Sequence, residues 1–367
     1  MQTFEQIATM GHERVVICSN PDVGLKAIIA IHSTVLGPGL GGVRMWPYPT
    51  FADALTDALR LSRGMTYKAA AAGLNLGGGK AVIIGDPKKD KSEALLRCFG
   101  AYVESLGGLY ITAEDVGTDM EDMELIHAET RYVTGVSPAH GGGGDPSPVT
   151  AFGVLQGIKA TCEWRFGGDG VLRGKTVAVM GLGNVGFHLA RYLREEGAKV
   201  LGCDIDADAI ARARKDAGVE IVKPQEIHDV ECDVFAPCAL GAVLNDRTIP
   251  RLKCAVVAGA ANNQLADEER DGAALEARGI LYAPDFVINA GGLVNVYNEL
   301  FGYNQERALR TTRGIYVNLT RVFEIARAQK IPTHTAAERM AEERIARLKA
   351  MGPRHWSRQM RALPERV

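Results

Sequence analysis

A strand, a glycine turn and a helix in immediate succession constrain the fold of this 367-residue chain more than any other feature. The apolar run at 176–180 leads into GLGNVG at 181–186, and the spacing of apolar residues predicts a helix over 185–196. A second apolar run at 199–203 then ends at Asp204, 23 residues after Gly181. GxGxxG alone is weak, but in this context it is the fingerprint of a dinucleotide-binding βαβ unit.

Each part of this fingerprint has a predicted physical role. The first glycine makes the turn, the second admits the pyrophosphate, and the third packs the helix on the strand. Free N–H groups at the helix start would bind the anion. Asp204 would accept hydrogen bonds from ribose hydroxyls and, with Asp206, repel a 2′-phosphate, which favours NAD over NADP. A tight turn without a cofactor is the alternative. The predicted cofactor contacts here are Gly181, Gly183, Asn184, Val185, Gly186 and Asp204.

Strands and helices alternate through the second part of the chain, which predicts a parallel sheet with helices on both faces. A segment rich in glycine and proline at 140–148 reads as a domain junction. We therefore expect a two-domain α/β protein: an N-terminal α/β substrate and oligomerisation domain at 1–145 and a doubly wound dinucleotide-binding domain at 146–330, with a cleft between them. Helices are expected over 304–327 and 337–349, and 331–367 is expected to pack back onto the first domain.

The totals exclude several classes of protein. A length of 367 residues allows two domains, and 46% hydrophobic with 23% charged residues is ordinary for a globular protein. A net charge of -2 gives no general attraction to nucleic acid or anionic membranes. Seven cysteines without a Cys-x-x-Cys pair argue for a reducing compartment and against disulfides or a metal site. Without a signal peptide or an apolar run of ~18 residues, a cytoplasmic protein is expected.

The N-terminal half should hold strands at 15–18, 27–31, 81–84 and 110–113, and helices over 51–62 and 93–106. The glycine-rich segment at 37–42 is expected to be a loop without regular structure. The strand at 110–113 opens onto Glu114 and Asp115, and functional groups often collect at such strand ends.

Two lysines in the segment RGMTYKAAAAGLNLGGGK at 63–80 point to chemistry, because no acidic residue accompanies Lys68 and Lys80 there. Burial and a second positive charge both lower a lysine pKa, and such a lysine acts as a general base near neutral pH. The glycines would let substrate and backbone approach closely. A phosphate loop is excluded, since Leu74 and Ala81 stand where it needs Gly and Ser or Thr. A plain turn with a solvated lysine is the alternative.

Several stretches together resemble the amino-acid dehydrogenase family that includes glutamate, leucine, valine and phenylalanine dehydrogenases, and its branched-chain members most. The matching stretches are GPGLGGVRMW (37–46), LSRGMTYKAAAAGLNLGGGKAVIIGDP (61–87), YITAEDVGT (110–118), DPSPVTAFGV (145–154), GLGNVG (181–186), FAPCALGAVLND (235–246), AGAANNQL (258–265) and YAPDFVINAGG (282–292). They cover most of the chain in the family's order.

The resemblance implies a role for each residue that matches the family's motifs. Lys68 would hold the substrate α-carboxylate, Lys80 would activate the water that attacks the imino carbon, and Asp115 would exchange protons with the amino group. The implied substrate contacts also include Leu40, Gly41, Gly42, Met65, Ala113, Asn262, Leu293 and Val296. The implied further cofactor contacts are Thr150, Cys238, Ala239 and Ala260. No metal is implied.

The expected function is the NAD-dependent, reversible oxidative deamination of leucine, valine or isoleucine to a 2-oxo acid and ammonia, in a homo-oligomer that is expected to be an octamer. Phenylalanine as the substrate, a non-catalytic NAD-sensing regulator and a structural oligomer are the alternatives. A basic tail, with arginines at 354, 358, 361 and 366, is expected to make a subunit contact or a solvated end.

Overall fold

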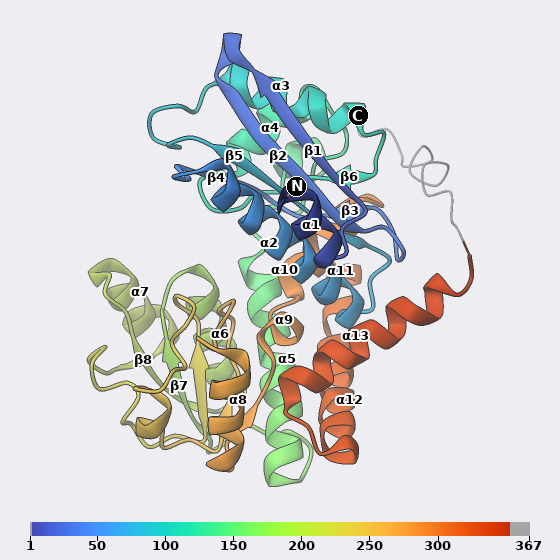
Figure 1. Cartoon of the computed structure of the whole chain (residues 1–367). Helices are drawn as coiled ribbons and strands as arrows, with labels where there is room; N and C mark the ends of the chain where they lie inside the picture. The colour runs from blue at the N-terminus through green and yellow to red at the C-terminus, as the bar shows by residue number, and fades with distance from the viewer. Residues whose placement is uncertain (1, 353–367) are drawn as a thin grey trace. The chain divides into compact units, whose positions relative to one another are not determined.

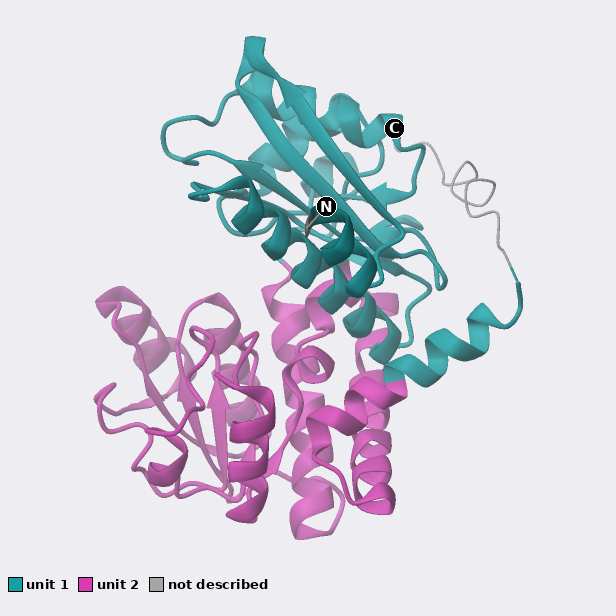
Figure 2. Cartoon of the chain, in the orientation of Figure 1, with its two compact units in different colours: residues 1–145, 296–305, 341–367 teal, residues 146–295, 306–340 magenta. Residues whose placement is uncertain are grey.

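The computed structural model describes residues 2–352, which form two compact units (Figures 1 and 2). Unit 1 holds residues up to 145 together with Val296–Gln305 and the described residues from Ala341 onward. Unit 2 holds Pro146–Asn295 and Glu306–Met340. The chain therefore passes between the units four times, where the sequence predicted only a single return at 331. The basic tail lies outside the described residues.

Unit 1 is built on a mixed six-stranded sheet. Strands β1, β2 and β5 pair antiparallel, while β5 pairs parallel with β3 and β4, and β3 pairs parallel with β6. Their bounds are β1 (Arg14–Asn20), β2 (Leu25–Ser33), β3 (Gly39–Leu40), β4 (Val43–Trp46), β5 (Gly77–Ile84) and β6 (Tyr110–Ile111). β5 lies in the middle of this sheet, so a side chain on it is easily enclosed.

Four helices of unit 1 begin before residue 146: α1 (Gln2–Thr9), α2 (Phe51–Ala71), α3 (Glu93–Ser105) and α4 (Met120–His127). Side-chain oxygens of Thr50, Ser92 and Asp119 cap the starts of α2, α3 and α4. The apolar face of α2 packs on β2 and β5, where Leu55 and Leu59 are buried against the sheet. Each such leucine contributes about 1.5–3 kcal/mol.

Three local expectations were wrong. Residues 37–42 were expected to lack regular structure, but β3 forms within them and pairs with β5 and β6. α2 continues to Ala71 instead of ending at 62, and β5 begins at Gly77 instead of 81, so Lys68 lies on a helix and Lys80 on a strand. The strand was predicted to begin only after the glycines because glycine is depleted in strands. The packing that favours glycine here involves residues far away in the sequence.

Close packing explains the glycines before Lys80. A Cβ on Gly78 would lie 2.2 Å from Thr66 Oγ1 and 2.3 Å from the Ser62 carbonyl of α2. On Gly79 it would lie 2.6 Å from the Tyr110 ring. These glycines therefore allow α2 and Tyr110 to approach β5 more closely than any other residue would permit.

Two late segments of the chain complete unit 1. Glu299 is 1% exposed, and its carboxylate accepts hydrogen bonds from the backbone N–H groups of Gly135 (2.9 Å) and Gly143 (3.0 Å). The Arg344 guanidinium donates to the Leu74 carbonyl at 2.7 Å and to the Gly73 carbonyl at 3.1 Å, beyond the end of α2. Loops and a helix end from the first part of the chain thus depend on partners far along the sequence.

Unit 2 contains a wholly parallel sheet of order β12-β11-β10-β7-β8-β9, which confirms the predicted doubly wound α/β fold. The strands are β7 (Thr176–Met180), β8 (Lys199–Cys203), β9 (Glu220–Ile221), β10 (Val234–Pro237), β11 (Val256–Val257) and β12 (Leu281–Tyr282). Ala178, Phe235 and Val257 are fully buried at its centre.

The helices of unit 2 lie before, between and after its strands along the chain. They are α5 (Ser147–Phe166), α6 (Asn184–Glu195), α7 (Ala207–Ala217), α8 (Glu268–Ala277), α9 (Asp285–Ile288), α11 (Gln305–Thr312) and α12 (Gly314–Gln329); α10 (Gly291–Glu299) and α13 (Thr333–Lys349) run from unit 2 into unit 1. The single helix expected over 304–327 is two helices that meet at Arg313. Within 2–352, no helix is long and apolar enough to cross a membrane.

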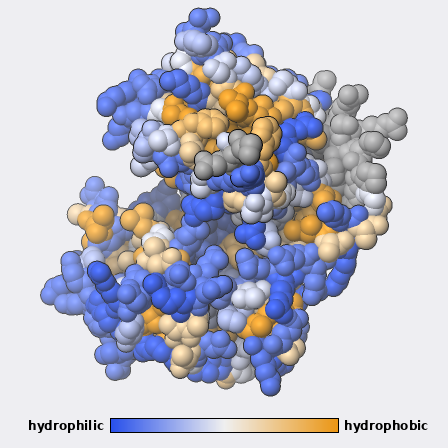
Figure 3. Space-filling view, viewed as in Figure 1, coloured by the Kyte–Doolittle hydropathy of each residue, from blue (hydrophilic) through white to orange (hydrophobic). Residues whose placement is uncertain are grey.

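The surface of unit 1 carries apolar residues over its edge strand β1 (Figure 3). Ile17 on this strand is 63% exposed, and Phe4 on α1 is 80% exposed. A sheet edge with exposed apolar side chains readily pairs with another chain.

Candidate functional site

Lys80 is the only lysine or arginine among the buried residues that the structure describes, with 5% of its surface exposed. It lies within β5, where the central position of the strand encloses it. Its Nζ atom is 3.0 Å from Oδ2 of Asp115, which follows β6 in the chain. Ion pairing of this kind is what allows a lysine to be buried.

Asp115 has a second cationic partner in Arg44 of β4, whose Nε donates to the same Oδ2 atom at 2.8 Å. Arg44 also donates from Nη1 to Asp57 Oδ2 at 2.8 Å, and the Tyr48 hydroxyl donates to that oxygen at 2.6 Å. Two cations and two carboxylates therefore form one continuous network around Lys80, which holds each side chain in a fixed position.

Burial and charge act in opposite directions on Lys80. Burial lowers the pKa of the Lys80 ammonium and outweighs the opposing effect of Asp115, while Arg44 lowers this pKa further. Burial alone would raise the pKa of Asp115, but Lys80 and Arg44 together bring it below its usual value. Burial therefore makes Lys80 easier to deprotonate than an exposed lysine, while its two cationic partners favour the carboxylate form of Asp115. Arg44 supplies a positive charge of the kind that the sequence analysis assigned to Lys68.

Glycines bring the Asp115 loop against the strands. A Cβ on Gly42 would lie 2.4 Å from the Glu114 carbonyl oxygen and 2.8 Å from Asp115 Cβ. The Tyr110 hydroxyl donates to the Gly41 carbonyl at 2.6 Å. The structure therefore places Gly41, Gly42, Lys80 and Asp115 together, as four residues of one site.

The other predicted substrate residues occupy both units. Met65 and Lys68 are half-buried and lie three positions apart on α2, so they share a face of that helix. Leu40 and Ala113 are buried in unit 1, and Val296 of α10 is half-buried. In unit 2, Leu293 is buried and Asn262 is exposed.

The glycine turn of unit 2 has the geometry that its sequence predicts. Gly181 has φ +102°, a value open mainly to glycine, and a Cβ on Gly186 would lie 1.9 Å from the Gly181 carbonyl oxygen. Gly183 precedes α6 without any side-chain cap, so the first N–H groups of this helix face no capping oxygen. The turn follows β7 where the sheet reverses its strand order between β10 and β8, the usual ligand position in such sheets.

Asp204 is held in place by the backbone around it. Its carboxylate accepts hydrogen bonds from the N–H groups of Leu182 (2.6 Å), Ile205 (2.7 Å) and Asp206 (3.0 Å). Asp206 instead caps α7, accepting from the N–H groups of the helix's second and third residues at 2.8 and 2.9 Å. The sequence predicted that both carboxylates repel a 2′-phosphate. In the structure, Asp204 binds the backbone of the glycine turn and of its own loop, whereas Asp206 caps α7.

Two further loops, one after β10 and one after β11, hold other predicted cofactor and substrate residues. The Cys238 N–H donates to Met180 at 2.7 Å, and a Cβ on Gly181 would lie 2.8 Å from Ala239 Cβ. Asn289 Nδ2 donates to the Ala260 carbonyl (3.1 Å) and to Asn262 Oδ1 (2.8 Å), which fixes the loop after β11.

Thr150 lies in the first turn of α5, and its hydroxyl donates to the Pro146 carbonyl at 2.9 Å. A Cβ on Gly292 would lie 3.0 Å from its Oγ1 atom, so the glycines that start α10 pack closely against this turn. No group of three or more His, Cys, Asp or Glu side chains with metal-binding geometry occurs among residues 2–352.

Three residues of the site were missed from the sequence: Arg44, Asp57 and Asn289. Arg44 stands alone between apolar residues in GGVRMW, and this isolation was the available signal. Asp57 and Asn289 carried no signal, because their partners are distant in the chain or depend on loop conformation.

Comparison with known proteins supplies the context for these geometries. Residues 12–132 match the model described as Glu/Leu/Phe/Val dehydrogenase, dimerisation domain, and residues 206–351 match Glutamate/Leucine/Phenylalanine/Valine dehydrogenase. Residues 177–228 also match a TrkA-N domain.

Similar proteins extend over nearly the whole chain. Leucine dehydrogenase of Thermoactinomyces intermedius is 59% identical over 94% of both chains. Phenylalanine dehydrogenase of Caldalkalibacillus thermarum is 49% identical over 94% of this chain and 93% of its own. The crystal structure of L-tryptophan dehydrogenase from Nostoc punctiforme is 47% identical, with a TM-score of 0.85 over 95% of this chain and 99% of its own.

Proposed function

Because this chain belongs to the Glu/Leu/Phe/Val dehydrogenase family, we propose that it catalyses the NAD-dependent, reversible oxidative deamination of branched-chain L-amino acids to 2-oxo acids and ammonia. The observation that carries the proposal is the buried Lys80 beside Asp115, since a regulator or a structural subunit needs no such pair. The higher identity to a leucine dehydrogenase than to a phenylalanine dehydrogenase, 59% against 49%, favours an aliphatic substrate.

The reaction assigns one role to each charged side chain. Lys68 binds the α-carboxylate of the substrate. Lys80, whose pKa burial lowers, takes a proton from the water that attacks the imino carbon. Asp115 exchanges protons with the departing or entering amino group. Removal of water from such a site strengthens each of these interactions.

NAD fits the chain's own residues in unit 2. The uncapped start of α6 supports the binding of a pyrophosphate by its N–H groups, and we assign the ribose hydroxyls to the carboxylate of Asp204, directly after β8. When bound, NAD accepts the hydride from the substrate Cα. We assign further cofactor contacts to Thr150, Cys238 and Ala239.

Substrate choice follows from the side chains assigned to the substrate's R group: Leu40, Ala113, Leu293 and Val296, all apolar. A substrate carboxylate that meets only apolar side chains would cost several kcal/mol, so glutamate should be excluded. Each methylene buried contributes ~0.8 kcal/mol, so leucine, isoleucine and valine should differ by only about tenfold.

A panel of kcat/KM values for leucine, isoleucine, valine, phenylalanine and glutamate, measured from NADH absorbance, tests the proposal. We expect the three aliphatic substrates to lead and glutamate to give no measurable turnover. Phenylalanine is the second candidate, because the small Ala113 would leave room for a ring. A lead of more than tenfold for phenylalanine would overturn the branched-chain assignment, and no turnover with any substrate would favour an NAD-sensing regulator.

We also infer the roles of the units and the state of the protein. Unit 1 binds substrate and forms subunit contacts, and unit 2 binds NAD. The exposed Ile17 on the edge strand β1 supports self-association, as does the match to a dimerisation domain. An octamer is our proposal for the subunit number, which sedimentation would test. The seven free cysteines support a reducing, cytoplasmic location.

A further inference from the structure

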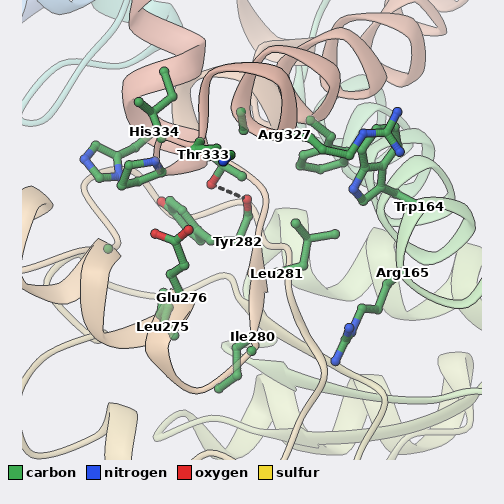
Figure 4. A pocket seen from close by; sticks show the side chains of 17 residues that line it. Trp164, Arg165, Leu275, Glu276, Ile280, Leu281, Tyr282, Arg327, Thr333 and His334 are labelled. Atoms are coloured by element: carbon green, nitrogen blue, oxygen red, sulfur yellow. Dashed lines mark hydrogen bonds between the residues drawn. The ribbon is translucent and has the colours of Figure 1, made fainter.

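Unit 2 contains a cavity of about 470 Å³ that the proposed reaction does not use. Its walls come from the end of α5, from α8, from β12 and the turn before it, and from the end of α12 with the start of α13 (Figure 4). None of the residues assigned to substrate or NAD lines it. Its volume lies within the ~300–1,000 Å³ of small-molecule sites.

The floor and one wall of this cavity are apolar and aromatic. Ile280, Leu281 and Tyr282 form the floor, and Phe323 is buried at the wall. The Trp164 ring packs against Phe323 at a centroid distance of 5.7 Å. Thr333 donates its hydroxyl hydrogen to the Tyr282 carbonyl at 2.8 Å, which ties the start of α13 to the floor. A flat apolar body would bury its surface against these side chains.

Three cations and one carboxylate line the same cavity. Arg165, Arg327 and Lys330 have no carboxylate within ion-pair distance among residues 2–352, and Glu276 lies on the opposite side from Arg165 (Figure 4). The Arg327 guanidinium lies over the Trp164 ring, 4.6 Å from its centroid. All three cations have exposed side chains, and an arginine stacked on an aromatic face, as Arg327 is on Trp164, is already oriented to receive an anion.

The backbone positions two of the lining residues closely. A Cβ on Gly272 would lie 2.5 Å from His334 Cε1, so Gly272 leaves room for the His334 ring beside α8. Lys330 ends α12 with φ +54°, a conformation in which glycine is the common residue. Because this position is occupied by lysine and not by glycine, it places a positively charged side chain at the cavity.

From these observations we propose that the cavity binds a small amphipathic anion, with a flat apolar body and a single carboxylate. The body lies on Leu281, and the carboxylate meets Arg327 and Lys330, which lie three positions apart at the end of α12. The residues that line this cavity include none of the proposed catalytic residues, so binding in the cavity can be tested independently of the dehydrogenase activity.

The experiment is calorimetric titration of the full-length protein with three probes that share one body: 4-phenylbutyrate, 4-phenylbutanol and 4-phenylbutylamine. NAD and 4-methyl-2-oxopentanoate, which cannot react with each other, are present in excess to fill the proposed catalytic site. We expect 4-phenylbutyrate to bind at least tenfold more tightly than the amine, with the alcohol between them. Equal binding of the amine and the carboxylate would overturn the proposal.

Two variants locate the binding. Arg327→Gln with Lys330→Gln should weaken 4-phenylbutyrate at least tenfold, whereas Arg214→Gln, an exposed arginine of α7 outside the cavity, should leave it unchanged. Ala326→Phe should abolish binding by filling the space; a normal thermal melt and normal NAD affinity would show that this variant folds. Unchanged 4-phenylbutyrate affinity in either the double variant or a folded Ala326→Phe variant would disprove the site.

Discussion

At the scale of single residues, the site depends on the balance of burial and charge at Lys80. A lysine in a polar, solvated position would be protonated at neutral pH and could not act as a base. Burial lowers the Lys80 pKa, while the Asp115 carboxylate stabilises the charged form of Lys80. Asp115 therefore raises the Lys80 pKa relative to a site with burial alone.

This balance predicts the pH dependence of the reaction. In the proposed mechanism activity requires neutral Lys80, so kcat/KM for leucine oxidation should rise with pH as Lys80 loses its proton, and level off above its folded pKa. Asp115→Asn removes the carboxylate that raises this pKa, so the acidic limb should move to lower pH even though the maximal rate falls. The measurement is the pH profile of kcat/KM for both proteins.

Lys80→Met is the matching control, because it keeps the length and apolar stem but has no proton to lose. It should lower turnover by several orders of magnitude, leave NAD affinity unchanged and leave no acidic limb from this residue. If the limb of Asp115→Asn moved to higher pH, or if Lys80→Met turned over normally, Lys80 would not be the base.

If Asp204 selects the cofactor by its charge, as we propose, Asp204→Asn removes that charge while an acceptor oxygen remains for the backbone. We expect the NAD/NADP ratio of kcat/KM to fall about tenfold, since a like charge no longer faces the 2′-phosphate. Asp206→Asn is the matched variant, because asparagine also caps helices and should preserve α7. An equal or larger change in Asp206→Asn would show that Asp204 is not the selector.

At the scale of elements, the contact between α2 and β5 depends on Gly78. Gly78→Ala would place a methyl group 2.2 Å from Thr66 Oγ1, so the helix or the strand must move. We expect a loss of about 3 kcal/mol or more in the free energy of unfolding, measured with urea.

Gly64 on α2 provides the comparison, because a Cβ there meets nothing within 4 Å. Gly64→Ala should be neutral or stabilise by up to ~1 kcal/mol, since alanine favours the helix. Similar losses from both substitutions would mean that packing against α2 does not explain the glycine at 78.

The same contact shows what the sequence could and could not predict. The parallel sheet and the glycine turn at 181–186 follow local rules, so the structure confirms them. The glycines at 77–79 were expected to let substrate approach, with a plain turn as the alternative, because their packing partners Ser62, Thr66 and Tyr110 are distant in the chain or on another element. Arg44 was missed for the same reason: its partners Asp57 and Asp115 identify it only after folding.

At the scale of the whole molecule, Arg344 joins the last described helix to the segment after α2. Its guanidinium donates to the carbonyls of Leu74 and Gly73 and to Asn75 Oδ1 at 2.7–3.1 Å. Arg344→Gln should cost about 1.5–3 kcal/mol in the free energy of unfolding and raise KM for leucine, because Lys68 lies near this end of α2.

Arg347→Gln, three residues further on, removes only an exposed pair with Glu343 on the same helix. Its effect on stability should stay below ~0.5 kcal/mol, and KM should not change. A loss from Arg347→Gln as large as that from Arg344→Gln would contradict the specific role of the Arg344 contacts.

The interleaving of the two units has a consequence for how the protein is made. When residue 145 leaves the ribosome, unit 1 still lacks Glu299 for the N–H groups of Gly135 and Gly143, and Arg344 for the segment after α2. The roughly 200 residues that follow take about 10–40 s at ~5–20 residues per second. The N-terminal part of unit 1 therefore lacks these hydrogen-bond partners, and stays accessible to chaperones, until residue 344 has been translated.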